Sequence, residues 1–533
     1  MLYQGNICQL VVGGVRHEGF ELRAGVRQGC PLSPLLFAVV ADLLLRRLAR
    51  LHPRMHFRAY ADDLCAVSSK GWEDIAILVS IFEEFSTISG LCLNLPKTVL
   101  VPLYACCHSQ LALNLAQRFP SWAGVSVQGH AKYLGFVLGP EREARAFSKP
   151  LHKFSQRARE WGRAGAGLAL TVAAYKIYIA SVLLFLLQLD DLPDTWPQFE
   201  QSAFRKLVPG PGEFCTPTDL HHLHSFGLPQ GFVDVQALAP VIRFRVAHFE
   251  NASQGGLRVR DRARELRSWL AASDHIVRAG IWADWYQHAF YAKLDAALDA
   301  FKARGIRAQD LDNSLAGSAA RPFPPGVANH IRRKFQSAAR QAFLRDDAAG
   351  VAVRLRRKTD RWAIPVLPRR RADRAAAVFA MLQAKAPPRM TAAYWRTLWN
   401  GWCTRRRMAS LHDGQETCCF GCPAGDDSIE HYSNCIFISE FARCRLCLPR
   451  APTPDSCLSD FLALDIANPD SNCDLILRKV LRTAAVYRTH CAVRHATIAP
   501  GVPAREALLQ AAHQLVRGHR RMTYLLDTSW LAS

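Results

Sequence analysis

The sequence predicts an α+β fold from Met1 to about Pro140 and a helical fold over most of the remainder. Short extended runs alternate with amphipathic segments up to about Leu138, a pattern typical of an antiparallel sheet with packed helices. From about Pro150 the apolar side chains follow helical spacing. The chain has 533 residues and a 50% hydrophobic fraction, enough for buried cores in several domains.

The elements of this amino-terminal part follow from local signals. Runs at 10–15 and 20–23 flank a His17-Glu18-Gly19 turn, and a Gly- and Pro-rich loop precedes a helix from about 34 to 51. That helix has one apolar face, formed by Leu35, Leu36, Val39, Leu43 and Leu48. We expect further elements as follows: a hairpin of strands 55–60 and 64–67 with an exposed acidic tip, a helix at 73–89, and strands at 91–95 and 133–138.

The chain gives no sign of export or membrane insertion. The longest uncharged apolar run, Ile177 to Leu189, has 13 residues, fewer than the roughly 18 to 20 that span a bilayer. We expect it to be buried in a helical bundle. The segment from Met1 to Gly14 lacks the pattern of a secretory signal, so the 17 cysteines are expected to be thiols or metal ligands. This predicts an intracellular protein, in the nucleus or cytoplasm or both, without a membrane partner.

Positive charge is concentrated in one stretch. The net charge is +22, and residues 331 to 410 contain 20 Lys and Arg against four acids. Codon bias would spread arginine evenly, whereas this clustering favours a polyanion-binding surface. Four tryptophans lie among the basic residues and could offer stacking faces to RNA: Trp362, Trp395, Trp399 and Trp402. A solvated helical surface is the alternative. The candidate nucleic-acid contacts are Arg332, Arg333, Lys334, Arg356, Arg357, Lys358, Arg369, Arg370, Arg371, Arg405, Arg406 and Arg407.

Seven cysteines fall between positions 403 and 447, and four residues in this stretch have the spacing of a metal site. The proposed ligands are Cys419, Cys422, His431 and Cys435. Three thiols and one imidazole suit a closed, structural Zn²⁺ site. Cys418 or Cys444 could replace one of these ligands, and buried reduced cysteines without metal are the alternative.

The adjacent Asp62 and Asp63 at the hairpin tip form a second candidate metal site. Neighbouring carboxylates repel one another unless a cation neutralises them. Mg²⁺ binds one or two carboxylates together with substrate phosphates, so this pair could serve phosphoryl transfer. Taken alone, an Asp-Asp turn is more often a solvated loop.

Four sequence blocks, in order, resemble the palm of reverse transcriptases, over a region that extends to about residue 245. They are Gly25-Val26-Arg27-Gln28-Gly29-Cys30-Pro31-Leu32-Ser33-Pro34, Tyr60-Ala61-Asp62-Asp63, Gly90-Leu91-Cys92-Leu93-Asn94-Leu95-Pro96-Lys97 and Lys132-Tyr133-Leu134-Gly135. The first block resembles the form found in non-LTR (LINE-type) retrotransposons. Group II intron maturases are the alternative within the class.

The resemblance implies roles for individual residues and a set of substrates. Catalysis and Mg²⁺ binding fall to Asp62 and Asp63, with Lys97 assisting the pyrophosphate leaving group. Template and nucleotide contacts are implied for Arg27, Gln28, Gly29, Tyr60 and Ala61, and a primer grip for Tyr133, Leu134 and Gly135. The implied partners are an RNA template, a DNA primer and deoxynucleotides. The Cys-Cys-His-Cys element also resembles one found after the thumb in that family.

The resemblance further implies five domains. They are a partial palm (1–145), a helical thumb (146–245), a basic helical connector (246–402), a zinc-knuckle-like module (403–447) and a helical tail (448–533).

One feature departs from the family pattern. A two-metal polymerase needs a further aspartate on a strand before the Gln-Gly loop, and the first aspartate here is Asp42. We therefore expect the chain to begin in mid-palm and to be inactive as a polymerase by itself. A non-catalytic RNA-binding remnant of such an element is the competing interpretation.

Overall fold

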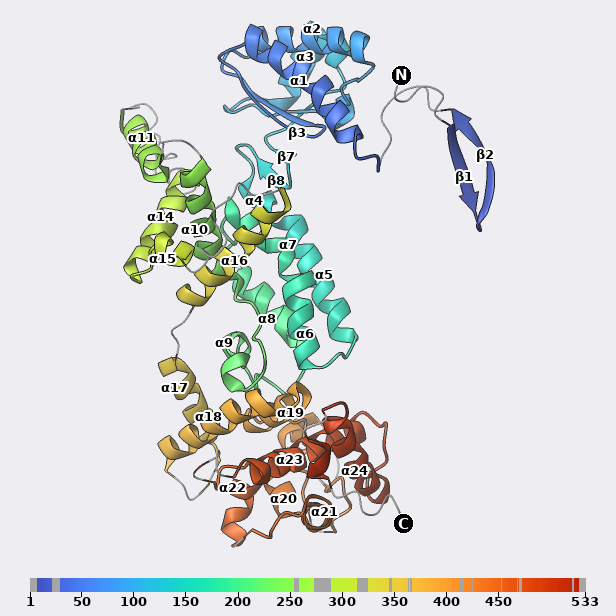
Figure 1. The fold of residues 1–533 in the computed structure, drawn as a ribbon, viewed down its shortest axis with the longest axis vertical. Helices are drawn as coiled ribbons and strands as arrows, with labels where there is room; N and C mark the ends of the chain where they lie inside the picture. The colour runs from blue at the N-terminus through green and yellow to red at the C-terminus, as the bar shows by residue number, and fades with distance from the viewer. Residues whose placement is uncertain are drawn as a thin grey trace. The chain divides into compact units, whose positions relative to one another are not determined.

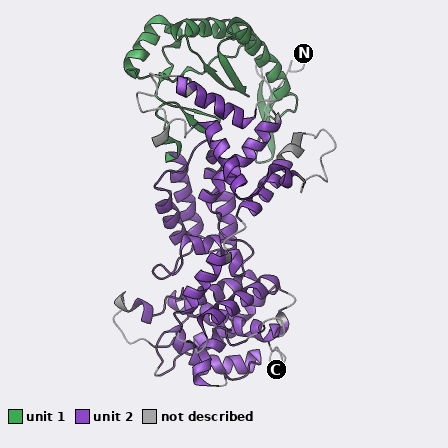
Figure 2. Ribbon diagram, turned by 90° about the vertical axis from the view of Figure 1, so that its left-hand side faces the viewer, with its two compact units in different colours: residues 1–148 green, residues 149–533 purple. Residues whose placement is uncertain are grey.

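The computed structural model forms two compact units, residues 1–148 and 149–533, which are coloured separately in Figure 2. It describes residues 7–21, 29–253, 258–272, 289–313, 325–344, 348–362, 364, 367–411, 417–423, 425–451, 453–466, 468, 472–519 and 522–526.

The amino-terminal unit contains short strands and three longer helices (Figure 1). Its strands are β1 (Ile7–Val12), β2 (Val15–Glu21), β3 (His56–Tyr60), β4 (Asp63–Val67), β5 (Val99–Leu100), β6 (Ser126–Val127), β7 (Ala131–Tyr133) and β8 (Phe136–Leu138). Its helices are α1 (Ser33–Leu51), α2 (Trp72–Ser89), α3 (His108–Arg118) and the short α4 (Glu143–Ala146), with 3-10 turns η1 (Leu95–Lys97) and η2 (Pro120–Trp122). The two predicted long helices and the acidic hairpin are confirmed.

The described strands of this unit form four separate two-stranded sheets. Among the described residues β1–β2, β3–β4 and β7–β8 are antiparallel hairpins, while β5–β6 is a parallel pair. The first hairpin turns at Gly13-Gly14 and not at His17 to Gly19, because both glycines adopt the positive φ that a tight two-residue turn requires. The expected strand 91–95 is also absent, since Pro96 lacks an N–H and the chain forms a 3-10 turn there.

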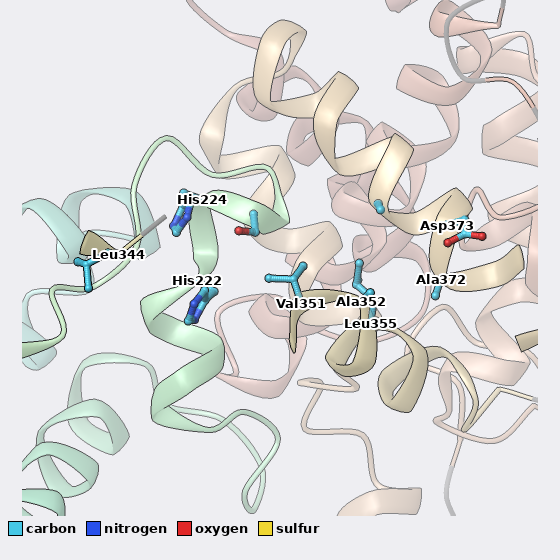
Figure 3. A pocket seen from close by; sticks show the side chains of 10 residues that line it. His222, His224, Leu344, Val351, Ala352, Leu355, Ala372 and Asp373 are labelled. Atoms are coloured by element: carbon cyan, nitrogen blue, oxygen red, sulfur yellow. The ribbon is translucent and has the colours of Figure 1, made fainter. Parts of the chain in front are cut away.

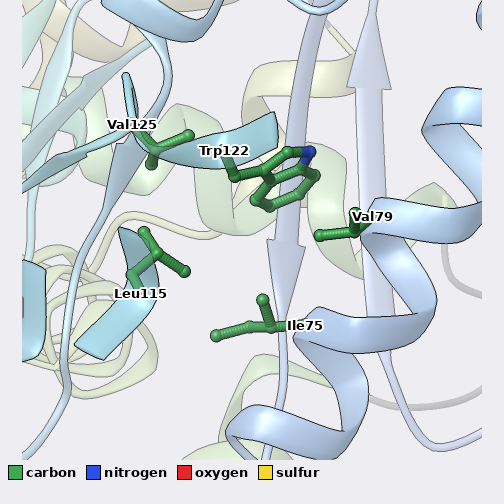
Figure 4. Close-up of a cluster of buried hydrophobic side chains, with 5 residues drawn as sticks. All are labelled: Ile75, Val79, Leu115, Trp122 and Val125. Atoms are coloured by element: carbon green, nitrogen blue, oxygen red, sulfur yellow. The ribbon is translucent and has the colours of Figure 1, made fainter. Parts of the chain in front are cut away.

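A small apolar core holds α2 and α3 together. It consists of Ile75, Val79, Leu115, Trp122 and Val125 (Figure 4). The predicted apolar face of α1 is only partly used: Leu48 is fully buried, whereas Leu35, Val39 and Leu43 are 64%, 64% and 65% exposed.

The carboxy-terminal unit is helical in its described parts (Figure 1). The first half contains α5 (Ser148–Arg163), α6 (Leu168–Ala174), η3 (Tyr175–Ile179), α7 (Ser181–Leu184), η4 (Leu186–Gln188), α8 (Trp196–Leu207), α9 (Pro217–His221), η5 (Leu223–Phe226), α10 (Val235–Ser253), α11 (Val259–Ala272), α14 (Phe290–Ala303) and α15 (Ala308–Asn313). The second half contains α16 (Pro325–Phe343), α17 (Ala348–Thr359), α18 (Pro368–Lys385), α19 (Pro388–Leu398), η7 (Arg406–Leu411), α20 (Ile429–Asn434), α21 (Ile436–Leu446), η8 (Pro454–Ser456), α22 (Cys457–Phe461), α23 (Cys473–Arg494), α24 (Val502–Val516) and η9 (Thr523–Leu525). Helices α19, α23 and α24 pack on one another.

The longest apolar run is buried on one side only. Ile179 and Leu183 are fully buried, but Ile177 is 57% and Tyr178 49% exposed. The run begins in the π-helical turn η3, in which the Ala180 N–H donates to Tyr175 O at 2.7 Å, and Phe185, beyond that turn, is 47% exposed as well. In the described part of the chain, no helix is both long and apolar enough to cross a bilayer.

The tryptophans of the basic stretch lie in the core, so the prediction that they stack on RNA is wrong. Trp395, Trp399 and Trp402 have no exposed surface, and Trp362 is 3% exposed. Trp399 packs on Trp395, with ring centroids 5.4 Å apart, and Trp402 packs on residues of other helices. Their large apolar area stabilises the helix packing and leaves no free face.

A buried ion network joins α22 to α23. Asp460 is 7% exposed and lies 2.8 Å from Lys479 Nζ and 2.7 Å from an Arg482 guanidinium nitrogen. Burial raises the pKa of Asp460, but the attraction and hydrogen bonds of these two cations outweigh it and hold the pKa below its usual value. Asp460 therefore stabilises the fold above the unfolded-state pKa of about 4, and this stabilisation is lost as the pH falls toward the lowered folded value.

We expect Asp460→Asn to lower the free energy of unfolding by about 3 kcal/mol at pH 7, because it leaves the buried Arg482 without its carboxylate partner and Lys479 with Asp465 alone. The difference from the parent should shrink as the pH falls below about 4. Urea denaturation at several pH values measures both effects. Asp310→Asn is the control, because Asp310 is 61% exposed in an ion pair with Arg307. Equal stability of the Asp460 variant and the parent at pH 7 would contradict the prediction.

Candidate functional site

The β3–β4 hairpin places two carboxylates side by side at its tip. Tyr60 pairs with Asp63, so the loop consists of Ala61 and Asp62 alone. Ala61 adopts a φ of 51°, in the left-handed region that a tight hairpin loop uses. Ala61, Asp62 and Asp63 are all exposed. The donor set fits Mg²⁺, which prefers carboxylate oxygens and keeps room for water and phosphate ligands.

The β7–β8 hairpin contacts the strand that leads to these carboxylates. The Tyr133 hydroxyl donates to the Arg58 carbonyl oxygen of β3 at 3.2 Å. Partial burial, together with the nearby Cys65 and Asp63, raises the pKa of Tyr133. Leu134 and Gly135 form the turn with φ values of 49° and 94°, as a type I′ turn requires. The structure thus brings Tyr133 into contact with the strand that leads into the Asp62–Asp63 block, from a position 75 residues away.

For the other predicted polymerase residues, the described structure shows no hydrogen bond or ion pair with the Asp62–Asp63 hairpin. Gly29 has a φ of 86°, which accounts for glycine at that turn. Arg27 and Gln28 lie outside the described residues. Lys97 closes the turn η1, where its backbone N–H donates to the Asn94 side chain at 3.3 Å, and its own side chain is exposed.

A second site is a group of four buried or half-buried metal-ligand side chains. The ligand atoms of Cys418, Cys422, His431 and Cys435 lie within 4.8 Å of one another. The Cys422 and Cys435 sulfurs are 3.5 Å apart. The predicted ligand set has Cys419, whereas this group contains Cys418 in its place. Cys418 was one of the two alternative ligands named from the sequence. Three sulfurs and one imidazole nitrogen are the donors that a tetrahedral Zn²⁺ ion takes.

Backbone turns bring the first two cysteines to the others. The Cys418 N–H donates to Gly425 O at 2.7 Å, and the Phe420 N–H points to the Cys418 sulfur at 3.4 Å. A Cβ at Gly425 would lie 2.2 Å from His431 Cε1, so only glycine leaves room for this ring. The Ser428 side chain caps α20 by accepting the His431 N–H at 3.1 Å.

The pKa values of the adjacent Cys418 and Cys419 thiols are shifted in opposite directions. Hydrogen bonds from Cys435 and His431 lower the pKa of Cys418 to about 4, although burial acts in the opposite direction. Burial raises the pKa of Cys419 to about 12, which keeps that thiol neutral. The geometry distinguishes the two cysteines directly, because the Cys418 sulfur belongs to the group of converging ligand atoms and the Cys419 sulfur does not.

A buried carboxylate joins this cysteine module to α23. Asp427 is 1% exposed; it accepts the Tyr432 hydroxyl, the His490 Nε2–H at 3.1 Å and the Arg405 N–H at 2.8 Å, and it pairs with Arg494. The residues that surround Asp427 come from three separate stretches of sequence, so its charge fixes how they pack.

We expect Asp427→Ala to lower the free energy of unfolding by about 3 to 5 kcal/mol, because it removes the acceptor of several buried donors and the partner of a cation. Urea denaturation measures the change. The neighbouring Asp426→Ala is the matched control, since Asp426 is 43% exposed and 3.8 Å from Arg406, and it should change stability by less than about 1 kcal/mol. Similar losses for the two variants would contradict this assignment.

Of the predicted nucleic-acid contacts, two are buried and form their hydrogen bonds inside the protein. Lys358 is 5% exposed and donates to Phe214 O at 2.7 Å, while Arg371 is 6% exposed and donates to Trp362 O at 2.5 Å. Neither is available to a ligand. Exposed side chains remain at Arg332, Arg333, Lys334, Arg356, Arg357, Arg369, Arg370 and Arg406, and half-buried ones at Arg405 and Arg407.

One cavity was not foreseen from the sequence. It has a volume of about 330 Å³ and is lined by two histidines, apolar side chains of α17 and the start of α18 (Figure 3). The His222 and His224 rings are stacked with centroids 6.0 Å apart, and His222 Nδ1 donates to Thr218 O at 2.9 Å. In the sequence, only the close spacing of the histidines at 221, 222 and 224 could have drawn attention to this place.

Comparison with family models assigns the amino-terminal unit. Residues 3–138 match the model of "Reverse transcriptase (RNA-dependent DNA polymerase)". The match extends through β8 and includes both the Asp62–Asp63 hairpin and the Tyr133 hairpin. Over these residues the chain is therefore similar to reverse transcriptases, a family that generally uses Mg²⁺ and acts on a nucleic-acid template with nucleotide substrates.

Proposed function

We propose that this chain is part of the RNA-directed DNA polymerase of a non-LTR retrotransposon, with Asp62 and Asp63 as its Mg²⁺ ligands. The observation that carries the proposal is the exposed pair of carboxylates on a tight hairpin, next to the Tyr133 hairpin and within the matched region. The form of the block from Arg27 to Pro34 supports the non-LTR branch.

The proposed reaction is the extension of a primer by one nucleotide. The primer 3′-oxygen attacks the α-phosphorus of a deoxynucleotide, a new P–O bond forms, the bond to pyrophosphate breaks, and the hydroxyl proton is lost. Mg²⁺ bound at Asp62 and Asp63 would neutralise charge on the phosphates. We propose that Lys97 donates a proton to the leaving pyrophosphate, that residues 133–135 position the primer, and that residues 27–29 contact the template and nucleotide.

Two metals need carboxylates from more than one strand. The hairpin would supply one part of the ligand set, and we propose that a carboxylate from a further strand completes it. The group at Cys418 is proposed to hold a structural Zn²⁺. The helices of 146–245 act as a thumb, and the basic helices of 246–402 contact the RNA.

The alternative function is RNA binding without catalysis, which the excess of positive charge also supports. A primer-extension assay separates the two. The chain is mixed with an RNA template, a DNA primer, deoxynucleotides and Mg²⁺, with and without an added polymerase segment that carries the first aspartate. Extension that needs both polypeptides supports the catalytic proposal. If the chain binds RNA in a gel-shift assay but neither mixture extends the primer, the result rejects the catalytic proposal and supports RNA binding without catalysis.

A further inference from the structure

We propose that Arg357, Arg361 and Arg407 form a phosphate-binding site, occupied by a phosphodiester group of a bound nucleic acid. These three residues are called the arginine cluster below. The proposal rests on the nucleic-acid function above and gives it a defined contact. Arg361 belongs to none of the basic runs noted in the sequence, and the cluster joins two separate stretches of the chain, one at the end of α17 and one at the start of η7.

Hydrogen bonds to one turn bring two of the guanidinium groups together. Arg361 donates to the carbonyl oxygen of Trp399 at 3.3 Å, and Arg407 donates to that of Asn400, the next residue. Asn400 has a φ of 52°, a left-handed conformation that asparagine tolerates. Adjacent carbonyls thus hold two cations at neighbouring positions. Arg357 lies four residues before Arg361 at the end of α17 and interacts with it electrostatically.

A loop, residues 209–214, forms the other side of this site and accepts hydrogen bonds from three cationic side chains. Arg407 donates to Pro211 O at 3.3 Å, Arg396 to Pro209 O at 2.8 Å and Lys358 to Phe214 O at 2.7 Å. A Cβ at Gly210 would lie 2.4 Å from the Phe214 ring. The carbonyl oxygens of this loop therefore face cations, and its glycines allow the close approach.

The described carboxylates nearby are engaged elsewhere. Asp219 is fully buried and lies 3.8 Å from Lys358 Nζ, while Asp360 is paired with Arg371 at 3.6 Å. Glu213, on the 209–214 loop, pairs with Arg205 at 2.8 Å. Within the described residues no ion pair involves the arginine cluster. Asp219 attracts Arg361 without forming an ion pair with it, so three cations lie near one buried carboxylate that Lys358 and Arg354 already share.

This imbalance favours an anion. Partial burial and the positive charges of Arg407 and Arg357 lower the pKa of Arg361, and partial burial lowers that of Arg407. Each guanidinium has five N–H donors, and the described hydrogen bonds use one of Arg361 and two of Arg407. Arginine forks match the two free oxygens of a phosphodiester. Because Arg357 and Arg361 are exposed, a long polymer can reach the site.

Arginine labelling tests the proposal on the intact chain. The protein is treated with p-hydroxyphenylglyoxal alone, with inorganic phosphate, or with a single-stranded RNA, and modification is read by mass spectrometry. We expect RNA to reduce the labelling of Arg361 and Arg407 several-fold. Protection by phosphate as well identifies a site for the phosphate group itself, whereas protection by RNA alone identifies a site that needs the polymer. Labelling of both arginines that neither additive changes would overturn the proposal.

A charge-matched pair of variants supplies the second readout. Arg361→Gln should reduce the slope of log affinity for single-stranded RNA against log salt by about 0.7, the amount for one phosphate contact. Arg307→Gln removes the same charge from a side chain that is 80% exposed and paired with Asp310, and should leave the slope unchanged. Equal slopes for the two variants would reject the cluster while leaving the primer-extension result, and thus the polymerase proposal, unaffected.

Discussion

Replacement of Asp62 by asparagine should reduce primer extension by at least about 1,000-fold in the two-polypeptide assay. The substitution keeps the size of the side chain but removes the negative charge that attracts Mg²⁺, and metal stabilisation of the reacting phosphates contributes several kcal/mol to the rate. Asp62 is exposed at a two-residue loop, so the fold should be unchanged. Radiolabelled primer extended over a time course gives the rate.

Asp42→Asn is the control for this experiment. Asp42 is also an exposed aspartate of the amino-terminal unit, but it lies on α1 in an ion pair with Arg46 at 2.5 Å. We expect the control to extend primers at the parental rate, with circular dichroism confirming that both variants fold. An Asp62 variant as active as the Asp42 control would remove the catalytic assignment of the hairpin.

Loss of zinc should cause a large decrease in stability. A ligand present at 1,000 times its dissociation constant stabilises the folded state by about 4 kcal/mol, so chelation or Cys435→Ser should destabilise the chain by at least about that amount. Cys435 has no exposed surface and lies 3.5 Å from Cys422. Metal analysis of the purified parent should give about one zinc per chain. Thermal unfolding with and without chelator measures the stability change.

Two single-cysteine variants test which ligand set is right. Cys418→Ser should lose zinc, whereas Cys419→Ser should keep it, because only Cys418 belongs to the group of converging ligand atoms. Gly425→Ala keeps every ligand but places a Cβ against the His431 ring, and should also weaken zinc binding. If Cys418→Ser retains zinc and Cys419→Ser loses it, Cys419 is the ligand, as the sequence analysis predicted. If the purified parent protein contains no zinc although its cysteine module is folded, the metal site is excluded.

Local sequence signals predicted the acidic hairpin well. The Ala61-Asp62 loop follows from strand-like runs on both sides, and the helices predicted on either side of the hairpin are likewise confirmed, at 33–51 and 72–89. The sequence could not show that Tyr133 reaches β3, because a hydrogen bond between positions 75 apart depends on the tertiary fold. The resemblance to a family suggested that proximity, while local patterns did not.

Burial was the property least accessible from sequence. Trp395 stands beside Arg396 along the chain and Trp399 lies three residues after it, yet both indoles are buried, while most of the basic side chains of this stretch are exposed. Lys358 and Arg371 are exceptions that bind carbonyl oxygens of distant or neighbouring segments. The choice between adjacent Cys418 and Cys419 was equally hidden, since it depends on a turn closed by the carbonyl of Gly425.

The most direct test of the account is to locate the metal on the hairpin without relying on activity. Fe²⁺ replaces Mg²⁺ in the complex of the chain with an RNA template, a DNA primer and a deoxynucleotide, and ascorbate with peroxide then cuts the backbone near the bound iron. The account predicts cleavage around residues 60–64 that excess Mg²⁺ suppresses and that Asp62→Asn abolishes. Cleavage elsewhere only, or cleavage that is unchanged in the Asp62 variant, would contradict it.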